Sequence, residues 1–573
     1  LNFTNEIKSR MGAGFSLMGP ISRVYSDNNE FIFGSNQLLG DIDVSPDVSS
    51  TFGIASDQQF AGTTFSFKKR PLRKIPSVEA SKKTLFGGGA LFCYDGASVY
   101  ENIFFEAPRV RNLTAVNNLP GLGTGTFTYA FVYSSIDEAG DIHESATFTS
   151  DPIEISSGTK AICGQIYITD CTRRSLTSSG PARPQLDIYR NESNGSVFFK
   201  IQSISFGEDE DYITFVDNFS NVIDKEKILY TTGGIPDNFP TGSVSDLVQY
   251  KGRIIASSVS GNNIALCSQP MRQGESVRFP LISPFRIEIQ DETERITGIE
   301  KMPDFLTVFT KDNAYAVFGD GPNAAGAGGF TLPKNIAPNQ GMVDGAPHLS
   351  TSLGLLYCSQ RGIYMIMPNT QIRYLGAQVE DDYSSTPLSM VLDDDINEVR
   401  VLFANSKVLI YNTFFNLWYR WDIAHASSAA TKLVDQRIIN GAYYVLQGNG
   451  TVLSEAKASY QDQHYTSSTQ TVNYDMELEI HSISANGLQG AQRVYRAQLL
   501  GDYKSPHTLT MTVFNDYVSS ATETHTSAIS SDSDPYLFRA HLTNQRNRAI
   551  SMKVAITNAS GEAVVLNGLA FEI

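Results

Sequence analysis

Short apolar runs separated by polar turns dominate this chain, and apolar residues at helical spacing are nearly absent. Leu91–Tyr94 is followed by Asp95–Ser98 and then by a second apolar run that begins at Val99. The Asp-Gly pair within this turn favours a hairpin, because both central turn positions tolerate positive φ. The pattern therefore predicts antiparallel strands joined by tight turns.

The same unit returns five times further along the chain. These hairpins are predicted at Ile254–Cys267, Leu306–Phe318, Leu355–Ile366, Val401–Tyr411 and Tyr443–Leu453. Matching positions in them are separated by 52, 50, 46 and 43 residues, at Ile254, Leu306, Leu356, Leu402 and Val445. Four-stranded propeller blades repeat at about 40–50 residues. With the first hairpin, the spacing predicts a β-propeller of about six blades whose last blade is completed by an N-terminal strand. Ordinary antiparallel sheets with accidental spacing are the alternative.

A different pattern lies between the first hairpin and the other five. Phe127–Tyr133 is rich in aromatic and β-branched residues, and a polar turn follows at Asp137–Asp141. Further short strands are expected at Gln185–Arg190, Val197–Ile201 and Tyr212–Asp217, with a turn at Asn194-Gly195. Strands and turns at this spacing predict a β-sandwich of the fibronectin type III kind. Its insertion into the propeller is tolerable, because loop-closure entropy grows slowly with length.

The C-terminal part shows strict alternation of apolar and polar residues. Met476–Ile480, Leu509–Phe514 and Ile550–Ile556 each follow this pattern, which predicts half-buried strands of a second sandwich. The polar stretch Gln461–Thr471 is expected to be a linker. The predicted fold is thus all-β, with four parts: residues 1–107 (N-terminal segment and first blade), 108–235 (inserted sandwich), 236–465 (remaining blades) and 466–573 (C-terminal sandwich).

Composition narrows the function classes. The formal net charge is −16, whereas proteins that grip nucleic acid through its phosphates are basic overall or in one domain. No apolar run reaches the 18 residues of a membrane-spanning helix. The five Cys residues include no Cys-x-x-Cys pair, which favours buried thiols made in a reducing cytosol over a disulfide framework.

Motifs that carry chemistry are missing from the sequence. The eight His residues show no metal-ligand spacing, and there is no Gly-x-Ser-x-Gly elbow. Two acidic clusters, Asp393–Asp395 with Glu398 and Glu380–Asp382, could supply a glycosidase carboxylate pair or a Ca²⁺ site. Turns are the better interpretation, because Asp and Asn favour them. We expect no catalytic, metal or cofactor residues, and a protein that is not an enzyme.

One basic run stands out in the acidic chain. It could contact an acidic partner or DNA, and a solvated loop before the first blade is the alternative. Its residues are Lys68, Lys69, Arg70, Arg73 and Lys74.

Three stretches resemble the tail nozzle or tail hub proteins of short-tailed phages (podoviruses). The first is Val408–Asn412 running on to Trp418–Trp421, which looks like a blade motif of that family, although Asn412 stands where Asp is frequent. Within it, Tyr411, Trp418 and Trp421 are expected to pack the blade. The second is Ile228–Gly234, similar to the exit of the inserted sandwich. The third combines Gln492–Val494, Leu499–Tyr503 and Tyr536–Arg539, similar to the C-terminal domain. The order of parts strengthens the resemblance, which does not cover the first 80 residues.

The resemblance implies a structural virion protein, made in the host cytoplasm and located in the tail. It implies a homohexameric ring below the portal-proximal adaptor, attachment of tail fibres or spikes, and a lumen through which double-stranded DNA passes without sequence-specific binding. No small-molecule substrate is expected. The alternatives are a secreted or surface carbohydrate-binding adhesion protein built on a β-propeller, and a propeller glycosidase.

Overall fold

The computed structural model describes residues 76–572, apart from 81–82, 88–89, 96–98, 118, 120, 170, 172, 174–182, 207–209, 219–221, 259–262, 384, 423–432, 440, 448–451, 455–460, 466–468, 474–475, 485–489, 504–506, 529–532 and 558–564. The chain divides into two compact units between Ser454 and Glu455. Among the described residues, no helix has the length and apolar character that a membrane crossing needs.

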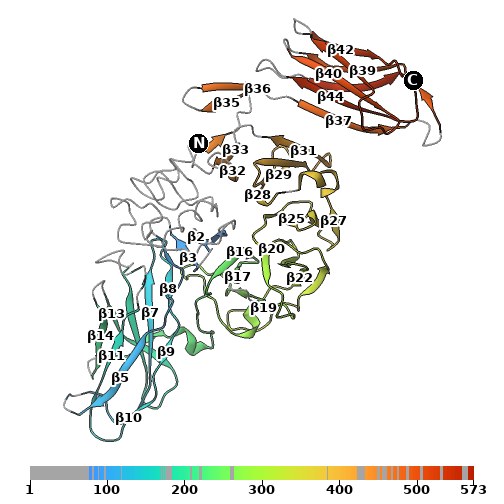
Figure 1. Cartoon of the computed structure of the whole chain (residues 1–573). Coiled ribbons are helices and arrows are strands. Elements are labelled where there is room, and N and C mark those ends of the chain that lie inside the picture. Colours follow the sequence, from blue (N-terminus) through green and yellow to red (C-terminus); the bar gives the residue numbers. More distant parts are fainter. Residues whose placement is uncertain are drawn as a thin grey trace. The chain divides into compact units, whose positions relative to one another are not determined.

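The first unit contains six antiparallel sheets that form the blades of a β-propeller (Figure 1). The first blade consists of β1 (Ser77–Ala80), β2 (Lys83–Phe86), β3 (Phe92–Tyr94) and β4 (Val99–Glu101). The second consists of β16 (Val244–Tyr250), β17 (Arg253–Ser258), β18 (Ile264–Cys267) and β19 (Arg286–Glu288). The third consists of β20 (Ile296–Lys301), β21 (Phe305–Thr310), β22 (Ala314–Phe318) and β23 (Lys334–Ala337).

The fourth blade consists of β24 (His348–Ser350), β25 (Leu355–Ser359), β26 (Gly362–Ile366) and β27 (Ile372–Tyr374). The fifth consists of β28 (Pro387–Asp393), β29 (Glu398–Phe403), β30 (Lys407–Asn412) and β31 (Leu417–Asp422). The sixth consists of β32 (Leu433–Ile439), β33 (Ala442–Gln447) and β34 (Val452–Ser454). Short 3₁₀ helices occur at η2 (Tyr230–Gly233), η3 (Ser283–Phe285), η4 (Gly376–Gln378) and η5 (Glu380–Asp382).

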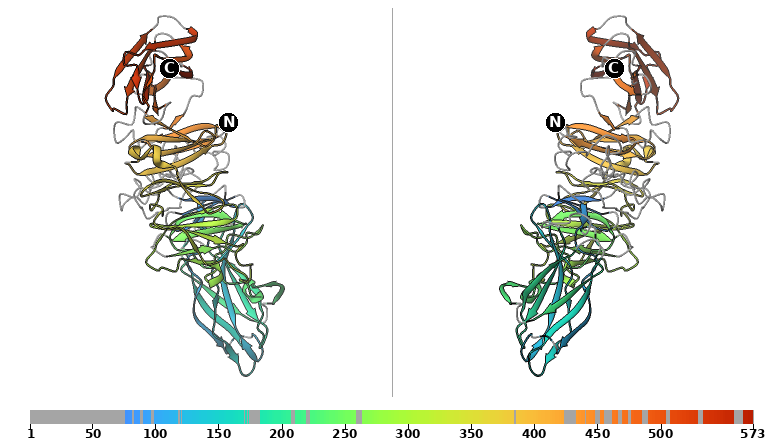
Figure 2. Two further views of the ribbon diagram at one scale, coloured as in Figure 1. Left: turned by 90° about the vertical axis from the view of Figure 1, so that its right-hand side faces the viewer. Right: turned by 90° about the vertical axis from the view of Figure 1, so that its left-hand side faces the viewer.

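The first strands of consecutive blades contact one another in the order β1, β16, β20, β24, β28 and β32, and Figure 2 shows the sheets following one another along the chain. Each of the five later predicted hairpins forms strands two and three of its blade, whereas the hairpin after Leu91 forms strands three and four. The N-terminal strand that was predicted to complete the sixth blade would fall before residue 76, outside the described residues.

Burial explains why the blade strands read as continuous apolar runs. Every position of β21 and of β29 is buried, because each sheet is covered on both faces by its neighbours. Hydrophobic clusters accordingly join consecutive blades. One cluster contains Leu85 and Ile254, a second Ile255 and Val308, a third Phe309, Tyr357 and Val401, and a fourth Leu402 and Val445.

The inserted sandwich has two main sheets around one aromatic core. The first has the order β14 (Tyr212–Asp217), β11 (Ala161–Tyr167), β5 (Arg109–Val116). The second has the order β15 (Asp224–Ile228), β13 (Phe198–Ser205), β12 (Gln185–Asn191), β7 (Tyr129–Ile136), β8 (Ile142–Glu144), with β9 (Phe148–Thr149) also pairing with β7. A small third sheet pairs β6 (Gly125–Phe127) with β10 (Ile153–Ile155). The predicted turn at Asn194-Gly195 is confirmed, with Asn194 at φ 60° between β12 and β13.

The second unit is a further sandwich. One sheet has the order β37 (Met476–Ile483), β44 (Ile550–Thr557), β40 (Thr508–Asn515), β41 (Glu523–Ala528), and the other β42 (Ser533–His541), β39 (Arg496–Tyr503), β45 (Val565–Glu572). A short pair joins β38 (Gln492–Arg493) to β43 (Arg546–Asn547).

Two predictions for this unit are corrected. The predicted linker contains a hairpin, β35 (Gln461–Tyr465) with β36 (Thr469–Asn473), because its Thr and Val residues suit an extended backbone. The alternation predicted half-burial for three strands. Buried and partly exposed positions do alternate along β40 and β44. Strand β37, in contrast, is exposed along almost its whole length, since it lies at the edge of its sheet.

Candidate functional site

The aromatic residues of the blade motif lie where the fifth blade meets its neighbours. Tyr411 is opposite Trp418 across β30 and β31, with ring centroids 4.9 Å apart. Trp418 donates its indole N–H to the carbonyl oxygen of Leu375, 2.9 Å away and just after β27 of the fourth blade. Tyr411 and Trp418 thus help to pack the fifth blade against the fourth.

Trp421 contacts a buried arginine on the side of the sixth blade. The guanidinium carbon of Arg400 lies 4.6 Å from the ring centroid of Trp421 and 4.4 Å from that of Tyr443 in β33. Arg400 also forms ion pairs with Asp393 (3.7 Å) and Glu398 (3.2 Å). These two carboxylates therefore balance a buried cation.

The β28–β29 connection is a turn, as predicted, whereas the second acidic cluster forms the 3₁₀ helix η5. Asp394 and Asp395 are exposed in the β28–β29 turn. Asp382 of η5 forms ion pairs with Lys407 and Arg420, both at 3.0 Å. Within the described residues, no three His, Cys, Asp or Glu side chains are grouped as a metal site requires. The five predicted basic contact residues lie outside the described residues: Lys68, Lys69, Arg70, Arg73 and Lys74.

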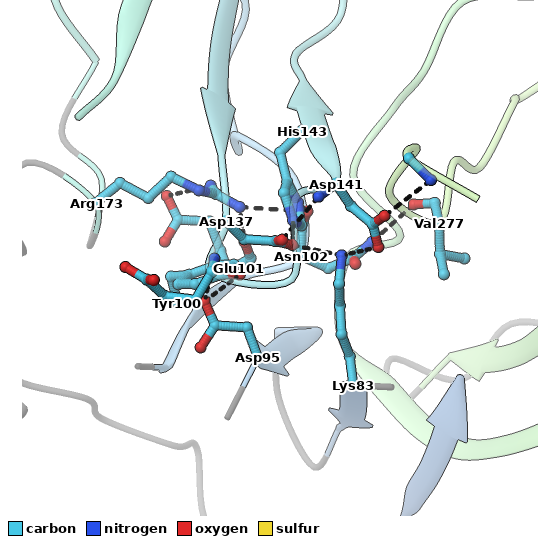
Figure 3. Close-up of polar contacts among 12 residues, drawn as sticks. Lys83, Asp95, Tyr100, Glu101, Asn102, Asp137, Asp141, His143, Arg173 and Val277 are labelled. Atoms are coloured by element: carbon cyan, nitrogen blue, oxygen red, sulfur yellow. Dashed lines mark hydrogen bonds and ion pairs between the residues drawn. The ribbon is translucent and has the colours of Figure 1, made fainter. Parts of the chain in front are cut away.

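A cluster of buried charged side chains joins the inserted sandwich to the first blade (Figure 3). The blade supplies residues from β2 and β4, and the sandwich supplies residues from the β7–β8 turn, from β8 and from position 173. We call this group the joint cluster. Its members are Lys83, Glu101, Asp137, Asp141, His143 and Arg173.

Lys83 points from the blade into the sandwich. Its ammonium group forms ion pairs with Asp137 and Asp141, which lie at the two ends of the β7–β8 turn. The turn itself is closed by the amide of Asp141, which donates to Asp137 Oδ1 at 2.9 Å. Burial lowers the pKa of Lys83, but the Cys93 thiol and the two carboxylates outweigh burial and raise it above its ordinary value. Lys83 is therefore charged and held between two modules.

His143 is fully buried behind this ion pair. Its Nδ1 lies 2.5 Å from the carbonyl oxygen of Asn102, and its Nε2 lies 2.7 Å from Asp137 Oδ2. Burial and the positive charge of Arg173 lower the pKa of His143 to about 4. Burial thus opposes the imidazolium form, although both ring nitrogens face acceptors. Burial also raises the pKa of Asp137, but His143 and Lys83 outweigh it and hold that pKa below its usual range.

Arg173 closes the other side of the joint cluster. Its Nη2 donates to the backbone carbonyl of Glu101 at 2.5 Å, and its Nη1 lies 3.6 Å from Glu101 Oε1. The guanidinium carbon lies 4.5 Å from the ring centroid of Tyr100 and 4.7 Å from that of Phe104. Two aromatic rings and a backbone carbonyl therefore fix this side chain against the end of β4.

The second blade completes the joint through its backbone. The amide of Ile142 donates to the carbonyl of Gly274 at 3.0 Å, and the amide of Ser276 donates back to the carbonyl of Ile142 at 3.0 Å. Asp141 Oδ1 accepts from the Gly274 amide at 3.0 Å. The Asn102 side chain donates to the carbonyl of Val277 at 2.8 Å. Strand β8 of the sandwich is thus bonded to two blades at once.

A small cavity borders the joint cluster. Its volume is about 10 Å³, space for about one water molecule, and its lining includes Lys83, Asn102 and Asp141. Cys93 in β3, which interacts electrostatically with Lys83, is buried, and burial raises its pKa to about 12, so its thiol is a poor nucleophile. The geometry serves to fix one module on another.

The sequence did not reveal this joint. Asp137 and Asp141 look like a solvated turn, and Lys83 looks like the end of the basic run. The one available signal was a carboxylate at each end of a short turn, beside the unusual His143 within a strand.

No family model and no curated protein matches this chain. Two solved structures of similar fold are BamB from Moraxella catarrhalis and Hsv2 from Kluyvelomyces marxianus. Each is 10% identical and covers 63% of this chain, with 98% of BamB and 97% of Hsv2 covered and TM-scores of 0.25 and 0.28. Because these TM-scores are low, we identify the β-propeller from the six sheets of this chain and not from the two structures.

Proposed function

We propose that this protein is a structural subunit of the tail nozzle, or hub, of a short-tailed phage. The observation that carries the proposal is the joint cluster, in which Lys83, Asp137 and Asp141 are buried to hold a sandwich on a propeller. A part that must transmit load needs stiff connections between its modules. The buried ion pairs of the joint cluster support the proposal because they form such a connection.

The subunits would form a closed ring, with six copies as in the proteins it resembles. A ring of identical subunits has head-to-tail interfaces that close by rotation. One face would bind the portal-proximal adaptor, and fibres or spikes would attach to the body. A net charge of −16 suits a channel through which double-stranded DNA slides without being held. The protein would reside in the virion tail.

Electron microscopy of the purified full chain tests this proposal. We expect round particles of uniform diameter with a central opening, at low and at high protein concentration, because a closed ring has a fixed number of subunits. Single elongated molecules at every concentration, with or without a portal–adaptor complex, would contradict it. Filaments or particles of mixed size would also contradict it, since they indicate interfaces that do not close.

A further inference from the structure

The sheet β14-β11-β5 of the inserted sandwich has one face turned towards the sandwich core and one turned away from it (Figure 1). The inward positions of these strands, such as Ile162, Ile166 and Phe215, fill the sandwich core. The outward positions alternate with them and point away from it. We call them the tyrosine face, which comprises Arg109, Arg111, Thr114, Cys163, Gln165, Tyr167, Tyr212, Thr214 and Val216.

Strand register brings its aromatic and polar groups together. Tyr167 in the central strand lies opposite Tyr212 on one side and Arg109 on the other. The next outward position of the same strand, Gln165, lies opposite Arg111. Arg111 Nη1 donates to Tyr167 Oη at 2.8 Å, which holds the guanidinium beside the ring.

A bulge in β5 produces this alignment. The register between β11 and β5 shifts between Cys163 and Gln165, and Asn112 adopts φ 55° at that point. Gly164 faces the bulge, where a Cβ atom would lie 2.8 Å from the side chain of Leu113. The shift leaves both Arg111 and Thr114 on the outer face, so the bulge determines which groups the face presents.

The exposure of the tyrosines indicates a binding surface. Tyr212 is 54% exposed and Tyr167 is 40% exposed, and they are direct cross-strand neighbours. Tyrosine pairs of this kind offer a large, rigid and amphipathic contact area. Exposed aromatic groups gathered in one place are typical of ligand or partner sites.

The charges of the face select an anionic partner. Its nine positions include two arginines and no carboxylate, on a chain whose net charge is −16. Glu106 pairs with Arg109 at 3.0 Å. Arg111 uses one N–H group in its hydrogen bond to Tyr167. A guanidinium group binds a carboxylate or phosphate through paired hydrogen bonds, so Arg111 favours a ligand that carries one of these groups.

We propose that the tyrosine face binds an acidic polysaccharide. The C–H groups on one side of a sugar ring pack on the faces of Tyr167 and Tyr212, whose π electrons carry partial negative charge. Arg111 pairs with the acidic group of the sugar, while Gln165 and Thr214 exchange hydrogen bonds with its hydroxyl groups. An open sheet face suits a chain-like ligand that extends beyond it.

A protein partner fits this face less well. Protein interfaces have an apolar centre, whereas Val216 is the one aliphatic residue among the nine positions. The inference goes beyond the proposed function and does not depend on ring assembly. If both hold, the tail part would carry a glycan contact on each subunit.

Affinity electrophoresis of the full chain in native gels tests the proposal. The gels contain polygalacturonate or hyaluronate as acidic glycans, or dextran as a neutral one. Because protein and acidic glycan are both anionic, unspecific charge attraction does not slow migration. We expect retardation by at least one acidic glycan and none by dextran. The double variant Arg111→Ala/Tyr212→Ala should bind at least tenfold more weakly.

A matched variant, in which a tyrosine and an arginine outside the tyrosine face are replaced, controls for the loss of these two residue types from the surface. Tyr495→Ala/Arg539→Ala, with both residues exposed in the second unit, should bind like the unchanged protein. Thermal unfolding confirms that both variants are folded. The proposal is overturned if dextran retards the protein as strongly as the acidic glycans, if no acidic glycan retards it, or if Arg111→Ala/Tyr212→Ala is retarded like the unchanged protein. A variant that alters only association with another protein molecule would assign the face to a protein contact instead.

Discussion

Trp418 donates its indole N–H to the carbonyl oxygen of Leu375 at 2.9 Å, so a side chain of the fifth blade satisfies a backbone group of the fourth. Neighbouring blades also meet through apolar packing, which has no direction, and through further polar contacts such as those from Gln436 Nε2 of the sixth blade to the carbonyl oxygens of Ser389 and Arg400 in the fifth. A hydrogen bond of this kind fixes how one sheet is placed on the next.

Replacing this donor should weaken the propeller. Trp418→Phe keeps an aromatic ring but leaves the Leu375 carbonyl without the indole donor, and we expect a loss of about 1–2 kcal/mol in the free energy of unfolding of the first unit. Urea unfolding measures it. Phe415→Leu, at a residue 66% exposed in the neighbouring turn, is the control and should change stability by less than about 0.5 kcal/mol. Equal effects of both variants would show that the hydrogen bond contributes nothing.

The ion pairs of the joint cluster should matter more. Lys83→Met leaves Asp137 and Asp141 buried without their cation, and breaking a buried pair in this way costs about 3–5 kcal/mol. Hydrogen exchange should also speed up at the amides of Ile142 and Ser276, which bond the sandwich to the second blade.

Lys553→Met provides the matched control, because the half-buried Lys553 pairs with the exposed Glu477 (2.8 Å) in the second unit. We expect a loss below about 1 kcal/mol there. If Lys83→Met cost no more than Lys553→Met, the joint cluster would not hold the two modules together.

Acidification should loosen the same joint. The pKa of His143 is lowered from 6.5 to about 4 by burial and Arg173, so between these pH values the unfolded chain binds a proton that the folded chain does not. Stability is therefore complete above pH 6.5 and falls as the pH drops towards 4, by an amount on the order of 3 kcal/mol. Asp137, whose pKa is held below its usual range, adds a further loss at lower pH.

Urea unfolding of the first unit across this pH range measures the contribution of His143. The change of stability with pH is compared between the unchanged protein, His143→Asn and the control His481→Asn. Replacing the exposed His481 should leave the change of stability with pH as it is in the unchanged protein. A stability that stayed flat or rose between pH 6.5 and 4 would mean that His143 is an imidazolium in the folded protein, stabilised by its two acceptors.

The sequence predicted the blades well and the joint not at all. Strands such as Phe305–Thr310 lie between two sheets, so their burial shows directly as a continuous apolar run. The joint depends on contacts between Lys83 and Asp137, which are remote in sequence and carry no periodic signal. Strand β37 shows the opposite failure, because its apolar positions alternate correctly while its place at a sheet edge leaves them exposed. Local pattern therefore determines strand formation, and tertiary neighbours determine what each strand contacts.

The proposed function requires this chain to be a rigid part of a closed ring. The mass of the purified full chain in solution, measured by native mass spectrometry over a range of protein concentrations, tests it most directly. We expect one closed oligomer of fixed copy number, with six as the number that the resemblance implies, and no open intermediates. A monomer at every concentration, unchanged when portal and adaptor proteins are added, would contradict the central claim.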